Sequence, residues 1–149
     1  MRVIGLDLGS KRVGVAVGDT DTRVATPVSV LPRTADLVAD RRKVAELVAE
    51  WEAGCVVVGL PISLDGSMGP AARAAETEIA ALAAALAVPV IAHDERLSTV
   101  SAHHALAEAG QSSRDRRERV DAVAASVFLQ DWLDRHAPAA PVEPGADPS

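Results

Sequence analysis

Acidic side chains stand at three places where the surrounding sequence is apolar. Asp7 lies within the run VIGLDL, Asp94 and Glu95 follow the run VPVIAH, and Asp121 lies in RVDAVAASVFLQ. Burying a lone ionised carboxylate is costly, and burying several together requires a positive charge to neutralise them. Carboxylate oxygens suit Mg²⁺ or Mn²⁺, and two such ions can clamp the attacking and leaving oxygens of a phosphodiester. These acids are therefore candidate metal ligands for phosphodiester cleavage.

Each acid also has a structural interpretation. Asp94 could serve only as a helix N-cap, and Glu95 could pair with the arginine that follows it. Asp121 could form an ion pair with Lys11 or Arg12. The acid of the first run is harder to explain in this way, because Asp is depleted in strands and leucines flank this one. The joint pattern therefore carries more weight than any single acid.

Basic side chains lie close to these acids in the sequence. Lys11 and Arg12 follow Asp7 after three residues, and the segment SSRDRRERV (112–120) has four arginines against two acids. Mixed charge runs are usually solvated, but beside a candidate metal site they can also contact phosphates. The loop LPISLDGSMG leads into a helix N-terminus, where free backbone N–H groups could hold another phosphate. The candidate phosphate contacts are Lys11, Arg12, Ser67, Arg96, Arg114, Arg116, Arg117 and Arg119.

The hydrophobic periodicity predicts the elements that position these residues. VIGLDL and RVGVAVGD form a hairpin through the short turn GSK, and residues 23–31 form a third strand. Pro27 places that third strand at an edge or at a bulge. Two further strands alternate with helices; the expected ranges are a helix over 35–52, a strand over 55–60, a helix over 70–87, a strand over 88–93, and helices over 98–109 and 113–135. The order predicts an α/β fold, a five-stranded mixed sheet with helices on both faces.

Composition sets the remaining limits. The chain has 149 residues, a formal net charge of −6 and one cysteine, Cys55, which opens an apolar run and suits a buried position in a reducing compartment. No secretory signal pattern or apolar run of about 20 residues is present, so a cytoplasmic protein is expected. We expect one domain over residues 1–135. The rest of the chain, 136–149, is rich in Pro, Ala and Gly and is expected to be a disordered tail.

Four ordered motifs resemble the YqgF/RuvX family, bacterial RNase H-like proteins related to the RuvC-type Holliday junction resolvases. The motifs are GLDLGSKRVGVAVGD, VVVGLPISLDGSMG, HDERLST and RVDAVAASVFLQ. The resemblance implies an RNase H-like fold and a Mg²⁺- or Mn²⁺-dependent nuclease whose catalytic metal ligands are Asp7, Glu95 and Asp121. Related resolvases carry a further Asp one helical turn before the last acid, where this sequence has Glu118. Asp94 stays open as an alternative strand-end ligand.

The resemblance implies two alternative substrates. The family is described as processing the 5′ end of the small-subunit (pre-16S) ribosomal RNA precursor, and some members are described as resolving four-way DNA junctions, usually as dimers. Two Trp, one Phe and no Tyr leave few platforms for base stacking, so structured RNA or branched DNA would be recognised by backbone and shape. Two other classes stay open: an actin/Hsp70-like ATP-binding module, whose phosphate loop also carries DLG, and a non-catalytic binding module.

Overall fold

Five strands form one mixed sheet in the computed structural model, which describes residues 1–62, 65–95 and 114–136. The first three strands form an antiparallel meander, and the last two pair in parallel, giving the order β3-β2-β1-β4-β5. The strands are β1 (Arg2–Leu8), β2 (Arg12–Asp19), β3 (Ala25–Pro32), β4 (Ala53–Leu60) and β5 (Val90–Asp94). Parallel pairing requires a crossover connection, and the helices between β3 and β5 supply it.

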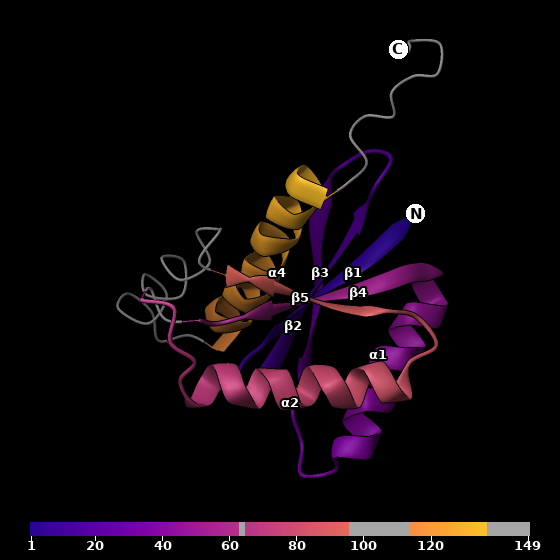
Figure 1. The fold of residues 1–149 in the computed structure, drawn as a ribbon. Helices are drawn as coiled ribbons and strands as arrows, with labels where there is room; N and C mark the ends of the chain where they lie inside the picture. The colour runs from indigo at the N-terminus through magenta and orange to yellow at the C-terminus, as the bar shows by residue number, and fades with distance from the viewer. Residues whose placement is uncertain (63–64, 96–113, 137–149) are drawn as a thin grey trace, which may run out of the picture.

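Helices cover both faces of this sheet. One face carries α4 (Arg114–His136), and the opposite face carries α1 (Leu37–Trp51) and α2 (Pro70–Ala85) (Figure 1). The α1 helix begins where Asp36 accepts a hydrogen bond from the Ala39 amide at 3.0 Å, an N-cap. Among the helices of the described residues, none is long and apolar enough to cross a membrane.

The predicted fold class is confirmed, and the predicted element bounds shift by up to two residues. The β4 strand begins at Ala53 rather than at 55, because Glu52 ends α1 in the left-handed conformation (φ 53°) and turns the chain at once. The β3 strand is an edge strand, and its register against β2 shifts between Ser29 and Pro27, so Pro27 lies at both an edge and a bulge. The helix expected over 98–109 and the expected tail beyond α4 lie outside the described residues.

Alternation along the strands divides the core into two layers. Side chains on one face of the sheet pack against α4, and those on the other face pack against α1 and α2. The α4 layer contains Val3, Ala16, Cys55, Val57, Ala124, Ala125, Phe128, Leu129, Trp132 and Leu133. The second layer contains Ile4, Leu6, Val13, Val15, Val44, Ala53, Val56, Val58 and Leu82, with Trp51 and Ile79 partly buried against it. Each layer holds one of the chain's two tryptophans.

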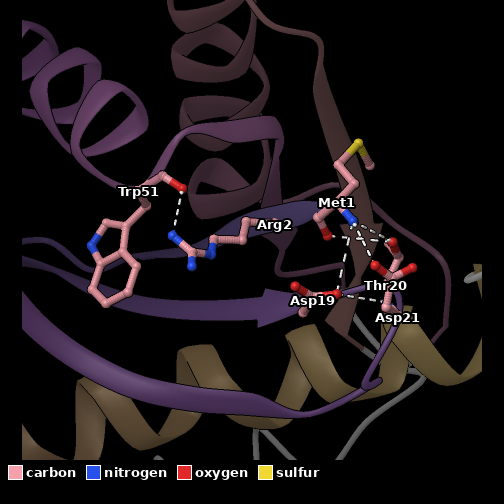
Figure 2. Close-up of polar contacts among 6 residues, drawn as sticks. All are labelled: Met1, Arg2, Asp19, Thr20, Asp21 and Trp51. Atoms are coloured by element: carbon pink, nitrogen blue, oxygen red, sulfur yellow. Dashed lines mark hydrogen bonds and ion pairs between the residues drawn. The ribbon is translucent and has the colours of Figure 1, made fainter.

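The N-terminus is held at the end of the sheet where β1 begins (Figure 2). The Met1 ammonium lies 3.8 Å from an Asp19 carboxylate oxygen and 3.6 Å from one of Asp21, and it donates a hydrogen bond to the Thr20 hydroxyl at 3.1 Å. The Asp21 backbone amide donates to the Asp19 carboxylate, which lowers the pKa of Asp19 below its usual value. These contacts join the two ends of the β1–β2 hairpin.

Cys55 is buried in the α4 layer, as predicted for the lone cysteine. Burial raises the pKa of its thiol, so the reactive thiolate is depleted at neutral pH. We therefore expect a thiol reagent such as iodoacetamide to modify the folded protein much more slowly than the denatured protein. Mass spectrometry of timed samples, with and without urea, measures both rates; equal rates would show that the thiol is accessible in the native state.

Candidate active site

Asp7 lies near the end of β1 on the face covered by α4. Its side chain shares that face with Val3, which packs in the α4 layer, and with Gly5, where an added Cβ would lie 3.0 Å from Leu129 Cβ of α4. Asp7 is 3 % exposed. Its partner across β2 is Gly14, and the β1–β4 register, Leu6 opposite Val58, carries on to place Gly59 on its other side. Asp7 therefore lies between two glycines.

Gly14 lets the backbone of α4 come down onto the sheet next to Asp7. A Cβ at Gly14 would collide with the backbone carbonyl of Asp121 and would lie 3.1 Å from the Ala122 amide nitrogen. Glycine inside a strand often marks such a close backbone approach. Because position 14 has no side chain, the backbone of Asp121 can contact β2 next to Asp7.

Gly59 provides the matching space for Glu95. A Cβ at Gly59 would lie 2.5 Å from Oε2 of Glu95 and 3.0 Å from the Phe128 ring. The Glu95 carboxylate, 7 % exposed, thus lies over the end of β4, in space that a larger residue would fill. The two glycines flank Asp7, so Asp7, Glu95 and Asp121 lie at the same end of the sheet, on the face that α4 covers.

Asp121 is engaged by a cation. Arg12, the first residue of β2, donates from Nε to Oδ2 of Asp121 at 2.8 Å, and both side chains are partly buried. The ion pair that the sequence left open as an alternative is therefore formed. No three acidic, histidine or cysteine side chains are grouped closely enough to hold one ion in the part of the chain that the structure describes.

The donor set nevertheless has the chemistry of a divalent-cation site. Asp7 and Glu95 are buried carboxylates, and Glu95 occupies a cradle that a Cβ at Gly59 would fill. Hard divalent cations take such oxygens as ligands. Asp121 could join the other two acids once its carboxylate is released from Arg12. The residues therefore fit a divalent cation, and in this structure Arg12 forms an ion pair with the third carboxylate, that of Asp121.

A tight turn next to these acids carries the basic residues. The Gly9 amide donates to the Arg12 carbonyl at 2.8 Å, which closes the β1–β2 turn, and Lys11 is exposed on that turn. Arg33, which follows β3, donates from Nη1 to the Gly9 carbonyl at 2.7 Å. Positive charge is therefore concentrated at the end of the sheet where the acids lie.

The other predicted site residues are only partly located. Asp94 is the last residue of β5, and Ser67 is exposed in a turn where its amide donates to Asp65 at 2.9 Å. The helix that follows this turn begins at Pro70 with Gly69 as N-cap and no side-chain cap. Arg96 lies outside the described residues. The positions Arg114, Arg116, Arg117, Glu118 and Arg119 belong to α4, but their side chains are not part of the described structure.

Sequence patterns did not identify four residues at this end of the sheet. They are Gly14, Gly59, Arg33 and His93. Glycine within a strand was an available signal for the first two. Arg33 carries no local signal, because its contact with the turn depends on how β3 pairs. His93 shares the α4 face with Glu95, two residues further on, and is 3 % exposed.

The amino-acid sequence matches a known protein family. A family model described as "RuvX: Holliday junction resolvase" matches residues 1–135. A protein of Anaeromyxobacter sp. (strain Fw109-5), named as a candidate pre-16S rRNA nuclease, is 51% identical over 138 residues, which are 92% of this chain and 100% of that protein. A Mycobacterium sp. (strain KMS) protein of the same name is 50% identical over 147 residues, 97% of this chain and 87% of that protein.

A solved structure shows the same fold. The Thermus thermophilus RuvC in complex with a Holliday junction substrate aligns with a TM-score of 0.56 at 17% identity, covering 91% of this chain and 94% of that one. The sheet order, the parallel β1–β4–β5 half and the C-terminal helix across one face are therefore those of the RNase H-like fold, as predicted.

Proposed function

Because this chain belongs to the RuvX family, we propose that it is a divalent-metal-dependent endonuclease that hydrolyses phosphodiester bonds in structured or branched nucleic acid. One observation carries the proposal most directly: Asp7, Glu95 and Asp121, from three separate elements, lie at one end of the sheet around two glycines. Burial of the Asp7 and Glu95 carboxylates favours a nearby cation, and Asp121 already pairs with one, the Arg12 guanidinium.

In this proposal Asp7, Glu95 and Asp121 hold Mg²⁺ or Mn²⁺, with Asp94 and Glu118 as secondary candidates. The bound cations would activate water and stabilise the charge on the phosphodiester oxygens, in the two-metal manner. Asp7, near the end of β1, and Glu95, directly after β5, supply buried carboxylate oxygens. Arg12 neutralises Asp121 when no cation does so, and it is placed to meet a phosphate when the carboxylate is taken over.

The proposed substrate is the 5′ end of the pre-16S ribosomal RNA precursor, and the alternative is a four-way DNA junction. The names of the relatives support the first, and the description of the family model supports the second.

The ATP-binding alternative has no support from the family model, which covers residues 1–135. We also propose that the protein acts in the cytoplasm. For junction cleavage we propose a homodimer, because a two-fold arrangement would present one site to each of the two symmetric strands.

A side-by-side assay tests the proposal. Purified full-length protein with Mg²⁺ or Mn²⁺ is incubated with a pre-16S RNA fragment and with a synthetic four-way junction, and the products are mapped on sequencing gels. We expect cleavage near the 5′ end of the mature RNA and little cutting of the junction. Symmetric cutting of the junction alone would move the assignment to the alternative, and no cleavage of either would contradict the nuclease proposal.

The basic turn gives a prediction about binding. Replacing Lys11 by Gln is expected to remove one phosphate contact, which lowers the slope of log K against log salt by about 0.7–0.9. Replacing Arg12 by Gln should leave the slope in EDTA unchanged, because Arg12 then pairs with Asp121, but it should destabilise the protein because that ion pair is lost. Fluorescence anisotropy with labelled substrate in EDTA, at several salt concentrations, measures the slopes. Lys43→Gln, on α1 at the opposite face, is the control and should leave the slope unchanged.

A further inference from the structure

A buried histidine joins β5 to α4 close to the acids. His93 Nε2 lies 2.7 Å from Oδ2 of Asp131, a residue of α4. The histidine is 3 % exposed and the Asp131 side chain 19 %. In the β4–β5 register His93 is opposite Gly59, the residue over which the Glu95 carboxylate lies. His93 therefore lies beside Gly59, next to the candidate site.

Arg135 holds the same carboxylate from the helix side. Its Nε donates to both oxygens of Asp131, at 3.1 and 3.0 Å, one helical turn further along α4. The Arg135 side chain is half exposed, so this pair alone contributes little to stability. Arg135 thus contacts both carboxylate oxygens, and Oδ2 is shared between Arg135 and His93.

The contact connects the two elements that carry two of the candidate ligands. Among the described residues β5 is an edge strand that pairs with β4, and Glu95 follows it directly. Asp131 follows Asp121 by ten residues on α4; it faces β5 through its contact with His93, and the backbone of Asp121 lies against Gly14 of β2. A shift of β5 relative to α4 would change the separation of Glu95 and Asp121.

We propose that His93 and Asp131 are positioning residues, whose hydrogen bond fixes the end of β5 against α4 and so sets the distance between the carboxylates of Glu95 and Asp121. The inference rests on the proposed function, since it concerns the same cation site. A buried polar pair is rarely the most stable way to fill a core, and apolar residues of similar volume are often as good or better. A directional contact at this position instead fixes a spacing, which a metal site requires within a fraction of an ångström.

Mn²⁺ binding tests the inference without relying on cleavage. The full-length protein is titrated with Mn²⁺ and the free ion is followed by electron paramagnetic resonance. Asp131→Ala is expected to weaken Mn²⁺ binding by about 10-fold or more, the effect typical of groups that orient metal ligands. Asp131→Asn keeps an acceptor oxygen for His93 and should restore affinity to within about threefold of wild type.

Glu78→Ala is the matched control. Glu78 joins α2 to α1 through two hydrogen bonds from Arg41, at 3.0 and 2.9 Å, on the opposite face of the sheet, and it is about as buried as Asp131. Its loss should lower thermal stability and leave Mn²⁺ affinity and cleavage unchanged. If Glu78→Ala and Asp131→Ala weaken Mn²⁺ binding equally, or if Asp131→Ala binds as the wild type does, the positioning role is wrong.

The wild-type results separate this inference from the proposed function. Cleavage that depends on Asp7, together with unchanged Mn²⁺ affinity in Asp131→Ala, overturns the positioning role alone. Mn²⁺ binding that Asp131→Ala weakens, in a protein that cuts neither substrate, supports the positioning role and overturns the nuclease. A wild-type protein that neither binds Mn²⁺ nor cleaves overturns both.

Discussion

Replacing Asp7 by Asn is expected to lower the cleavage rate by about 10²–10³-fold or more, with little loss of fold. Stabilisation by a catalytic metal contributes several kcal/mol to the transition state, and about 1.4 kcal/mol corresponds to a factor of ten in rate. The neutral amide keeps the shape of the side chain in its place between Gly14 and Gly59, but it removes the anionic ligand. Single-turnover cleavage at saturating Mn²⁺ measures the loss, and circular dichroism checks the fold.

The control for this variant lies on the same hairpin. Asp19→Asn changes a carboxylate at the far end, where β2 stops and the chain's N-terminus is held, so its cleavage rate should stay within about twofold of wild type. Nucleic-acid binding in EDTA should survive in both variants. An Asp7→Asn protein that cleaves at the wild-type rate would remove this acid from the catalytic group, and with it the main support for a metal-dependent nuclease.

Replacing Gly14 by Ala should damage both stability and activity. The new methyl group meets backbone of α4 at Asp121 and Ala122, and backbone cannot rotate away as a flexible side chain can. Overpacking of this kind costs about 1–3 kcal/mol, occasionally more. In a chain of this size that loss corresponds to a melting temperature lower by roughly 3–10 °C. Because α4 must also move off the sheet, Asp121 is displaced and cleavage should fall by about 10²-fold.

Differential scanning calorimetry and the cleavage assay measure the two effects separately. Gly69→Ala serves as the control, since an added Cβ there meets nothing within 4 Å; its stability should change by only about 0.5 kcal/mol, through its place as helix N-cap. A Gly14→Ala protein that melts with the wild type would show that α4 can tilt freely at this point, and the close approach would then have no role in placing Asp121.

The sequence was sufficient for the fold because hydrophobic period and turn residues are local signals. The hairpin and the Pro27 edge strand follow from residues within one element or the turn beside it. On α4, Ala124, Ala125 and Phe128 follow Asp121 at helical spacing, and all three are fully buried. Element bounds were less accurate where one residue in an unusual conformation, Glu52, moved the start of a strand.

The surroundings of the site depended on distant pairings. Which glycine lies beneath which acid is decided by the register of β1 with β2 and by where α4 crosses, and neither can be read from one segment. The same is true of the Arg12 contact with Asp121, 109 residues away, which the sequence left among several alternatives. His93 gave no signal at all, since a histidine in an apolar strand has no fixed role until its partner is known.

The division of the core into two layers gives the protein two separate optical reporters. Trp132 is buried between the sheet and α4, whereas Trp51 lies on the other side, with the Arg2 guanidinium 5.8 Å from its ring centre. Indole emission responds to its own surroundings, so variants that keep one tryptophan would follow the two sides of the sheet independently during unfolding. Coincident transitions would identify a single cooperative unit, and an earlier change at Trp132 would identify the α4 side, which bears the candidate site, as the less stable half.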